Sequence, residues 1–107
     1  MISALAGMAN QLNKSMPMVI DSVTRLDNIL ASPVSPKFTY NYTIDATLHE
    51  INTANFFVQM KSTIIKGVCT TPEMKIFVHN GVTVSYSYRA RDGAFAGRID
   101  VSPNDCG

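Results

Sequence analysis

Apolar and polar residues alternate most regularly near the end of the chain. From residue 82 to residue 88 every second residue is Val or Tyr, and Thr or Ser stands between them. Asp92-Gly93 follows, a dipeptide typical of a two-residue type I′ turn, and residues 95–101 form a second arm. This pattern predicts an antiparallel β-hairpin over residues 82–101. The predicted register places Tyr88 opposite Gly97, Tyr86 opposite Ile99, and Val84 opposite Val101.

That register separates two faces of the hairpin. One face gathers the apolar and aromatic residues Val82, Val84, Tyr86, Tyr88, Phe95, Ile99 and Val101. The other face receives Thr83, Ser85, Ser87, Arg98 and Asp100. A slip of one residue would mix the two faces, so the pattern specifies the register strongly. The glycine at position 97 leaves room for an aromatic ring to lie across the strand pair.

An earlier hairpin is predicted upstream. Phe38, Tyr40, Tyr42 and Ile44 alternate with polar residues, which indicates a half-buried strand with an aromatic face. The stretch from residue 19 to residue 31 is less regular, but its apolar residues suit a partner strand. The segment 32–36 contains two prolines and predicts the turn between these strands.

Helical spacing predicts two shorter helices. Residues 2–13 place apolar side chains on one helix face, namely Ile2, Leu5, Met8 or Ala9, and Leu12. A second helix is predicted at 72–79, because Thr71-Pro72-Glu73 supplies a capping hydroxyl, a proline at the first helical position and a carboxylate near the positive end of the dipole. Asn80-Gly81 can end it in a left-handed conformation.

A longer, central helix is predicted from Thr53 to Cys69. Thr53 can cap it, and no Pro or Gly interrupts the segment before Gly67. Apolar side chains cover an arc of roughly 160° around its axis. Two interpretations remain open: the helix packs between the sheet and the N-terminal helix, or one flank helps to line a groove for another polypeptide. On the second interpretation the candidate partner-binding residues are Phe56, Met60 and Lys61.

Together these elements predict a single α+β domain that spans residues 1–107. We expect a small antiparallel sheet of about four strands, arranged as two hairpins and packed with the N-terminal helix and the central helix. Hydrophobic residues make up 46% of the 107 residues and charged residues 16%, so the chain can form a buried core.

Charge and hydropathy exclude several classes of partner. Nine basic residues against eight acidic ones leave no positive footprint for nucleic acid. No apolar run approaches the roughly 20 residues of a transmembrane helix. The first residues are mildly apolar but lack a basic start, so they do not resemble a signal peptide. If the protein is exported, we expect its targeting segment in a longer precursor.

The sequence offers little that resembles a catalytic or metal site. His49 and His79 stand alone, and His49-Glu50 lacks the second histidine of a zinc protease motif. No serine stands in the G-x-S-x-G pattern of a nucleophile elbow. Arg89, Arg91 and Arg98 gather near the predicted turn, where solvated charge is a simpler interpretation than an anion site. We therefore predict a protein that is not an enzyme and has no metal or cofactor.

The two cysteines, Cys69 and Cys106, bracket the short helix and the C-terminal hairpin. Their spacing matches neither a zinc site nor a C-x-x-C redox motif. They are either two buried free thiols in a cytosolic protein or a disulfide in an exported one. The near-terminal position of Cys106 favours the disulfide, because such a position is rarely buried in a core. The bridge would contribute about 4 kcal/mol in the chain-entropy model.

The C-terminal segment resembles the AspS (YghG-type) pilotins, small periplasmic lipoproteins of type II secretion systems. The resemblance rests on the order of Cys69, Pro72, the run from Met74 to Val78, Gly81, two alternating strands and Cys106. It implies a small antiparallel sheet packed with helices and a disulfide between the two cysteines. It also implies a non-catalytic function, binding of the C-terminal segment of a secretin, and a lipid anchor at the outer membrane in the full precursor.

A small exported hydrolase or ligand-binding protein is the alternative hypothesis. The pilotin hypothesis expects an exposed apolar groove that takes a helical segment of an envelope protein. The alternative expects a closed cavity with converging polar groups, such as His49 or His79 beside a carboxylate.

Overall fold

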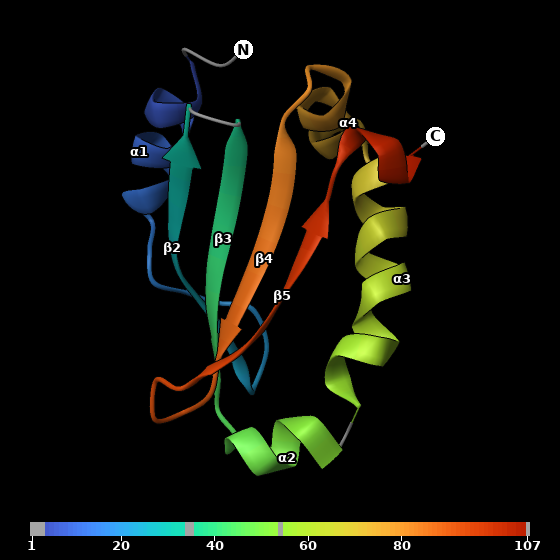
Figure 1. Ribbon diagram of the computed structural model, residues 1–107. Coiled ribbons are helices and arrows are strands. Elements are labelled where there is room, and N and C mark those ends of the chain that lie inside the picture. Colours follow the sequence, from blue (N-terminus) through green and yellow to red (C-terminus); the bar gives the residue numbers. More distant parts are fainter. Residues whose placement is uncertain (1–3, 34–35, 54, 107) are drawn as a thin grey trace.

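The computed structural model describes residues 4–33, 36–53 and 55–106. Helices gather on one side of a twisted sheet, with the first helix beside the second strand and the longest helix beside the last strand, at the opposite edge (Figure 1). In chain order the elements are α1 (Leu5–Asn13), β1 (Met18–Val19), β2 (Thr24–Ser32), β3 (Lys37–Ile44), α2 (Leu48–Thr53), α3 (Phe56–Thr70), α4 (Pro72–His79), β4 (Thr83–Arg89), β5 (Phe95–Val101) and the 3₁₀ helix η2 (Pro103–Cys106).

The sheet has five strands in the order β1-β2-β3-β4-β5, and the class is α+β as predicted. Both predicted hairpins are present, as the antiparallel pairs β2–β3 and β4–β5. The prediction of an all-antiparallel sheet of about four strands is wrong in two respects. The short strand β1 adds a fifth strand next to β2, and β3 pairs with β4 in parallel. The parallel pairing follows from the helical connection α2–α3–α4, which returns the chain to the end of the sheet from which β3 started.

The C-terminal hairpin has the predicted register but a different turn. Tyr88 pairs with Gly97, and the pairs nearer the ends of the arms agree with the prediction as well. A type I′ turn needs a positive φ at both central residues, but only Gly93, with φ of 89°, has one. The loop spans three residues, because the Ala90 N–H donates to the Ala94 carbonyl at 2.8 Å. A bulge then restores the register.

This bulge changes the position of Phe95. Arg89 pairs with Phe95, whereas Tyr88 pairs with Gly97, so the β5 strand carries one extra residue between these pairs. Since side chains alternate along a strand, the extra residue turns Phe95 to the other face of the sheet. Phe95 is 57% exposed, and its predicted place on the apolar face is wrong.

The helices differ from prediction mainly at the centre of the chain. The predicted helix from Thr53 to Cys69 is confirmed as α3, which begins later, at Phe56, because Thr53 ends the separate and unpredicted helix α2. Asn55 between them has φ of 54°, a left-handed conformation that interrupts a helix. The N-terminal and the short helix are confirmed as α1 and α4. Ile2 of the predicted first helix and residues 34–35 of the predicted turn lie outside the described residues.

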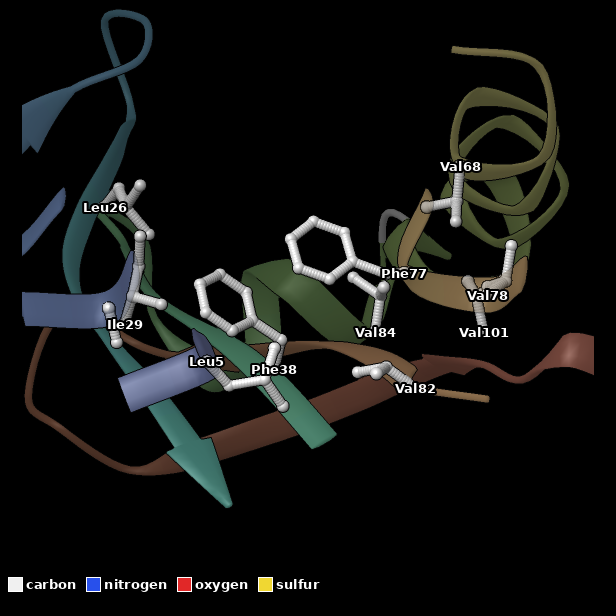
Figure 2. Packing of buried hydrophobic residues seen from close by; sticks show 11 residues of the cluster. Leu5, Leu26, Ile29, Phe38, Val68, Phe77, Val78, Val82, Val84 and Val101 are labelled. Atoms are coloured by element: carbon white, nitrogen blue, oxygen red, sulfur yellow. The ribbon is translucent and has the colours of Figure 1, made fainter. Parts of the chain in front are cut away.

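The core lies between the helices and one face of the sheet (Figure 2). Phe38 is fully buried, and its ring stacks on that of Phe77 with centroids 5.0 Å apart. The apolar face of the C-terminal hairpin contributes Val84 and Val101, which are also fully buried. The other labelled members of this cluster are Leu5, Leu26, Ile29, Val68, Val78 and Val82.

A disulfide joins Cys69, in the last turn of α3, to Cys106 in η2, with the two Cα atoms 5.3 Å apart. The predicted bridge is therefore confirmed. It ties the C-terminal end of the chain to the longest helix, which also packs beside β5. In Figure 1 both η2 and the end of α3 lie near the C-terminus. The position of α3 relative to the sheet is thus fixed by packing and by a covalent bond.

Candidate partner-binding groove

A groove of about 510 Å³ runs between α3 and the loop that joins β1 to β2. It exists because α3 packs on β5 and α4, whereas α1 packs on β2, toward the opposite edge of the same sheet face. The interpretation that α3 lies between the sheet and the N-terminal helix is therefore wrong. The residues that line the groove are Ile20, Asp21, Val23, Thr24, Tyr42, Phe56, Met60, Ile64, Gly67, Val68, Thr71, Met74, Tyr86 and Tyr88.

Tyr42 from β3 and Tyr86 and Tyr88 from β4 form the floor of this groove, and Tyr40 extends their row of rings beyond it. The parallel register places Tyr40 beside Tyr86 and Tyr42 beside Tyr88. Their rings stack, with centroids 5.3 Å apart in the first pair and 5.0 Å in the second. The alternation seen in the sequence puts these side chains on one face of each strand, and the parallel pairing then makes them a continuous aromatic surface.

The floor carries no charge at neutral pH. Burial raises the pKa of Tyr88 to about 12 and also raises the pKa values of Tyr42 and Tyr86 well above their usual value. The phenol hydroxyls therefore stay protonated. Tyr40 contacts α4 through its hydroxyl, which lies 3.9 Å from the Met74 sulfur. The groove thus offers apolar ring faces with a few neutral hydroxyl groups.

One wall of the groove is the inner face of α3. Phe56, Met60 and Ile64 follow one another at four-residue spacing, so they lie on one face of the helix. The Phe56 ring also packs edge-on against Tyr88, with centroids 5.1 Å apart. Side chains at this spacing form the kind of ridge against which a second helix can pack.

The opposite wall is the loop before β2. Its Ile20 and Val23 are each 50% exposed although both are large and apolar. Between them in the chain, Asp21 accepts a hydrogen bond from the Val23 N–H at 2.9 Å. This backbone hydrogen bond holds the pKa of Asp21 below its usual value, so the carboxylate is ionised at neutral pH.

Two of the three predicted partner-binding residues line the groove. Phe56 and Met60 do, but Lys61 is exposed and is absent from the lining. Ile20, Asp21 and Val23 are not predictable from the sequence, because the stretch before β2 lacks regular alternation. The alternating pattern predicts an apolar face for the tyrosines but no role in binding, since their apposition depends on the parallel pairing of β3 with β4.

The remaining candidates for chemistry do not form a shared site. His49 is exposed on α2, and His79 borders a hollow whose other lining residues are Pro72, Lys75, Ile76 and Asn80. Within the described part of the chain, no three His, Cys, Asp or Glu residues gather in a way that could hold a metal ion. Over the same residues, no helix has the length and apolar character to span a membrane.

The arginines near the hairpin turn bind separate partners. The Arg91 Nε lies 2.6 Å from Asp45 Oδ1, and its Nη2 donates to the Asp45 carbonyl at 3.0 Å. Arg98 pairs with Asp100 at 3.1 Å, and Arg89 donates to the Gly93 carbonyl at 3.1 Å. These contacts agree with the interpretation of solvated charge at the strand ends.

Comparisons with known proteins identify a family for this chain and solved structures with a similar fold. The model of a family described as "Domain of unknown function (DUF8479)" matches residues 3–94. A comparison with curated protein sequences found no match. Among solved structures, the chain is similar to a Pseudomonas aeruginosa protein described as a candidate secreted protein, with a TM-score of 0.82 and 12% identity over 98% of this chain and 91% of that one.

Two further similar structures are pilotins. One is the pilotin EpsS of the Vibrio vulnificus type 2 secretion system, with a TM-score of 0.77 and 12% identity over 98% of this chain and 90% of that one. The other is the type II secretion system pilotin AspS of Vibrio cholerae, with a TM-score of 0.72 and 12% identity over 97% of this chain and 90% of that one. The chain therefore has a pilotin-type fold.

Proposed function

We propose a binding function for this chain, which belongs to the family described as Domain of unknown function (DUF8479). It binds a helical segment of an envelope protein, the C-terminal segment of a secretin, without catalysing a reaction. The observation that carries this proposal is the groove between α3 and the β1–β2 loop, with its neutral aromatic floor and apolar walls. An amphipathic helix buries its apolar face in a groove of this kind.

The fold supports the same proposal. EpsS and AspS are pilotins of type II secretion systems, and this chain shares their fold over nearly its whole length. A small hydrolase or ligand carrier would place converging polar groups in a closed cavity. Along this groove the lining side chains are mostly aliphatic or aromatic, and neither His49 nor His79 is among them.

We place the protein in the periplasm. The Cys69–Cys106 bridge supports this location, because disulfides persist in oxidising compartments and cytosolic thiols are kept reduced. A lipid on the full precursor would hold the domain at the outer membrane, as in the lipoproteins that the sequence resembles. Mass spectrometry of the protein purified from its source membranes would detect that lipid.

A peptide-binding measurement tests the groove directly. The probe is a labelled peptide of the C-terminal segment of the type II secretin from the same organism, and a scrambled peptide of equal composition is the control. We expect Met60→Glu to weaken binding by at least about tenfold, because the charge would lie in an apolar contact. Val58→Glu introduces the same charge at a position of α3 that is 79% exposed, and should leave binding within about twofold of wild type.

Fluorescence anisotropy gives the dissociation constants, and circular dichroism checks that both variants are folded. Equal binding of the native and scrambled peptides would contradict the proposal. So would equal loss of binding in the two folded variants, since only one of them changes the groove.

A further inference from the structure

Asp21 lies where the apolar groove meets a second, polar hollow. This hollow has a volume of about 280 Å³, and its lining includes Arg25, Asp45 and Arg91. The loop residue Asp21 lines both the hollow and the groove. A helix that lies in the groove and continues past Asp21 would therefore leave an apolar surface and enter a polar one at this residue.

The charge of Asp21 is not compensated by a neighbouring cation. Arg25 pairs with Asp27, and Arg91 pairs with Asp45, so the two nearby guanidinium groups already have carboxylate partners. Among the residues that the structure describes, no ion pair includes Asp21. Its Oδ1 accepts the Val23 N–H, a bond that orients the carboxylate without neutralising its charge.

Asp21 is also the one ionised side chain along the described lining of the groove. The other lining residues are aliphatic, aromatic, Met, Gly or Thr, and the tyrosines among them stay protonated. Where one carboxylate borders an apolar surface, a cation on the ligand finds a partner and an anion is repelled. The site therefore discriminates by charge at a single defined point.

We propose that Asp21 selects the partner: the groove takes an amphipathic helical segment whose apolar face ends at a Lys or Arg that pairs with the Asp21 carboxylate. This inference rests on the proposed function, because it requires a helix in the groove. The apolar side chains of that segment recur at three- and four-residue spacing. Its basic residue follows about one helical turn beyond the last apolar contact, where the groove opens into the polar hollow.

Two synthetic peptides test the proposal. Both are alanine-based helices of about 16 residues, or four to five turns, with leucines along one face. One peptide carries a Lys about one turn before the first leucine and another Lys about one turn after the last leucine. A cation then reaches Asp21 in either orientation of the peptide. The other peptide carries Gln at both places. Their dissociation constants are measured against the full chain by isothermal titration calorimetry.

The protein variants isolate the charge. Asp21→Asn removes it but keeps a side-chain oxygen that can accept the Val23 N–H. Asp92→Asn is the matched control, because Asp92 Oδ1 accepts the Ala94 N–H two residues on, the same kind of turn, and Asp92 does not line the groove. Both variants change the net charge of the protein equally.

We expect the wild type and Asp92→Asn to bind the Lys peptide about fivefold more tightly than the Gln peptide at low ionic strength. Asp21→Asn should bind the two peptides equally, with the Gln peptide as tightly as wild type binds it. The preference of the wild type should shrink at about 0.5 M salt, where charges are screened.

Equal binding of the two peptides by the wild type would overturn the selection by Asp21 and leave the groove function standing, provided that Met60→Glu weakens both. A preference that persists in Asp21→Asn would overturn it as well. If neither peptide bound the wild type, this inference would be overturned, and the secretin peptide would decide separately whether the groove function stands.

Discussion

At the scale of single residues, the contact between Gly97 and Phe57 determines how closely α3 approaches β5. A Cβ atom added to Gly97 would lie 2.7 Å from Phe57 Cζ and 2.8 Å from Cε2, which is closer than carbon atoms pack. The Phe57 ring cannot easily move away, because it packs edge-on against Phe56 and Tyr88 with centroids 5.0 and 5.6 Å apart. The sequence pattern predicted that an aromatic ring lies across Gly97. The ring in contact with Gly97 is that of Phe57, and it comes from α3.

We therefore predict that Gly97→Ala lowers the free energy of unfolding by about 1–3 kcal/mol, the usual cost of overpacking. Urea denaturation measures the change. Gly7→Ala is the matched control: it adds the same methyl group in α1, where the new carbon would meet nothing within 4 Å beyond its chain neighbours and its own helix backbone, and should be neutral or stabilising by up to about 1 kcal/mol. Phe57→Leu should recover part of the loss in the Gly97→Ala background, and a Gly97→Ala protein as stable as wild type would disprove the close contact.

Asn13 shows what a sequence pattern cannot specify about one residue. In the sequence it is a polar residue at the end of a predicted helix. In the structure its amide donates to the Ile29 carbonyl and its Oδ1 accepts the Ile29 N–H, both at 2.8 Å. These bonds satisfy the backbone N–H and carbonyl of Ile29. The two-residue strand β1 pairs only with Leu26 and Arg25, so it does not extend to this part of β2. A partner 16 residues away is set by how α1 packs, which local periodicity does not contain.

At the scale of elements, the disulfide holds α3 to the end of the chain. Reduction, or the double variant Cys69→Ala/Cys106→Ala, should lower the free energy of unfolding by about 4 kcal/mol, since the bridge closes a loop of 37 residues in the unfolded chain. The measurement is the urea midpoint with and without reductant. In the double variant the reductant should have no further effect. A wild-type midpoint that reductant leaves unchanged would contradict this assignment of stability to the bridge.

The elements also show how far the sequence could predict the fold and the groove. Alternation and turn residues predicted both hairpins, and the register of β4 with β5 was correct because a slip would have mixed its faces. The parallel contact between β3 and β4 was not predictable in this way, since either pairing satisfies the same alternation. Phe95 was misplaced because one bulged residue reverses the faces of a strand.

The contrast between local patterns and contacts of distant segments also explains why only one wall of the groove was predicted. Helical geometry alone identified Phe56 and Met60, because the apolar arc of α3 exceeds what one contact with the sheet needs. The opposing wall, with Ile20 and Val23, is made by an irregular loop whose position depends on the pairing of β1 with β2. A surface formed between distant segments can therefore be identified only from the tertiary structure.

At the scale of the whole molecule, the stacked tyrosines limit the stability of the fold at alkaline pH. In the unfolded chain tyrosine ionises near pH 10, whereas burial in the folded protein raises the pKa of Tyr88 to about 12 and also raises those of Tyr40, Tyr42 and Tyr86. Above about pH 10 the unfolded state thus binds fewer protons than the folded state. The stability that comes from protonated tyrosines is complete below that pH and decreases as the pH rises toward the folded-state values.

We therefore predict that tyrosine ionisation has no effect on the urea midpoint between about pH 8 and pH 9.5. Above about pH 10 it should lower the midpoint progressively. Tyrosinate absorbance should appear together with unfolding, because the buried phenols stay protonated until the sheet opens. Tyr86→Phe removes one of these phenols and keeps its ring, so the decrease of the midpoint with pH should be shallower in this variant than in wild type. A folded protein whose tyrosines all titrate near pH 10 would show instead that the groove floor is open to water, and the neutral aromatic surface proposed for the partner helix would lose its physical basis.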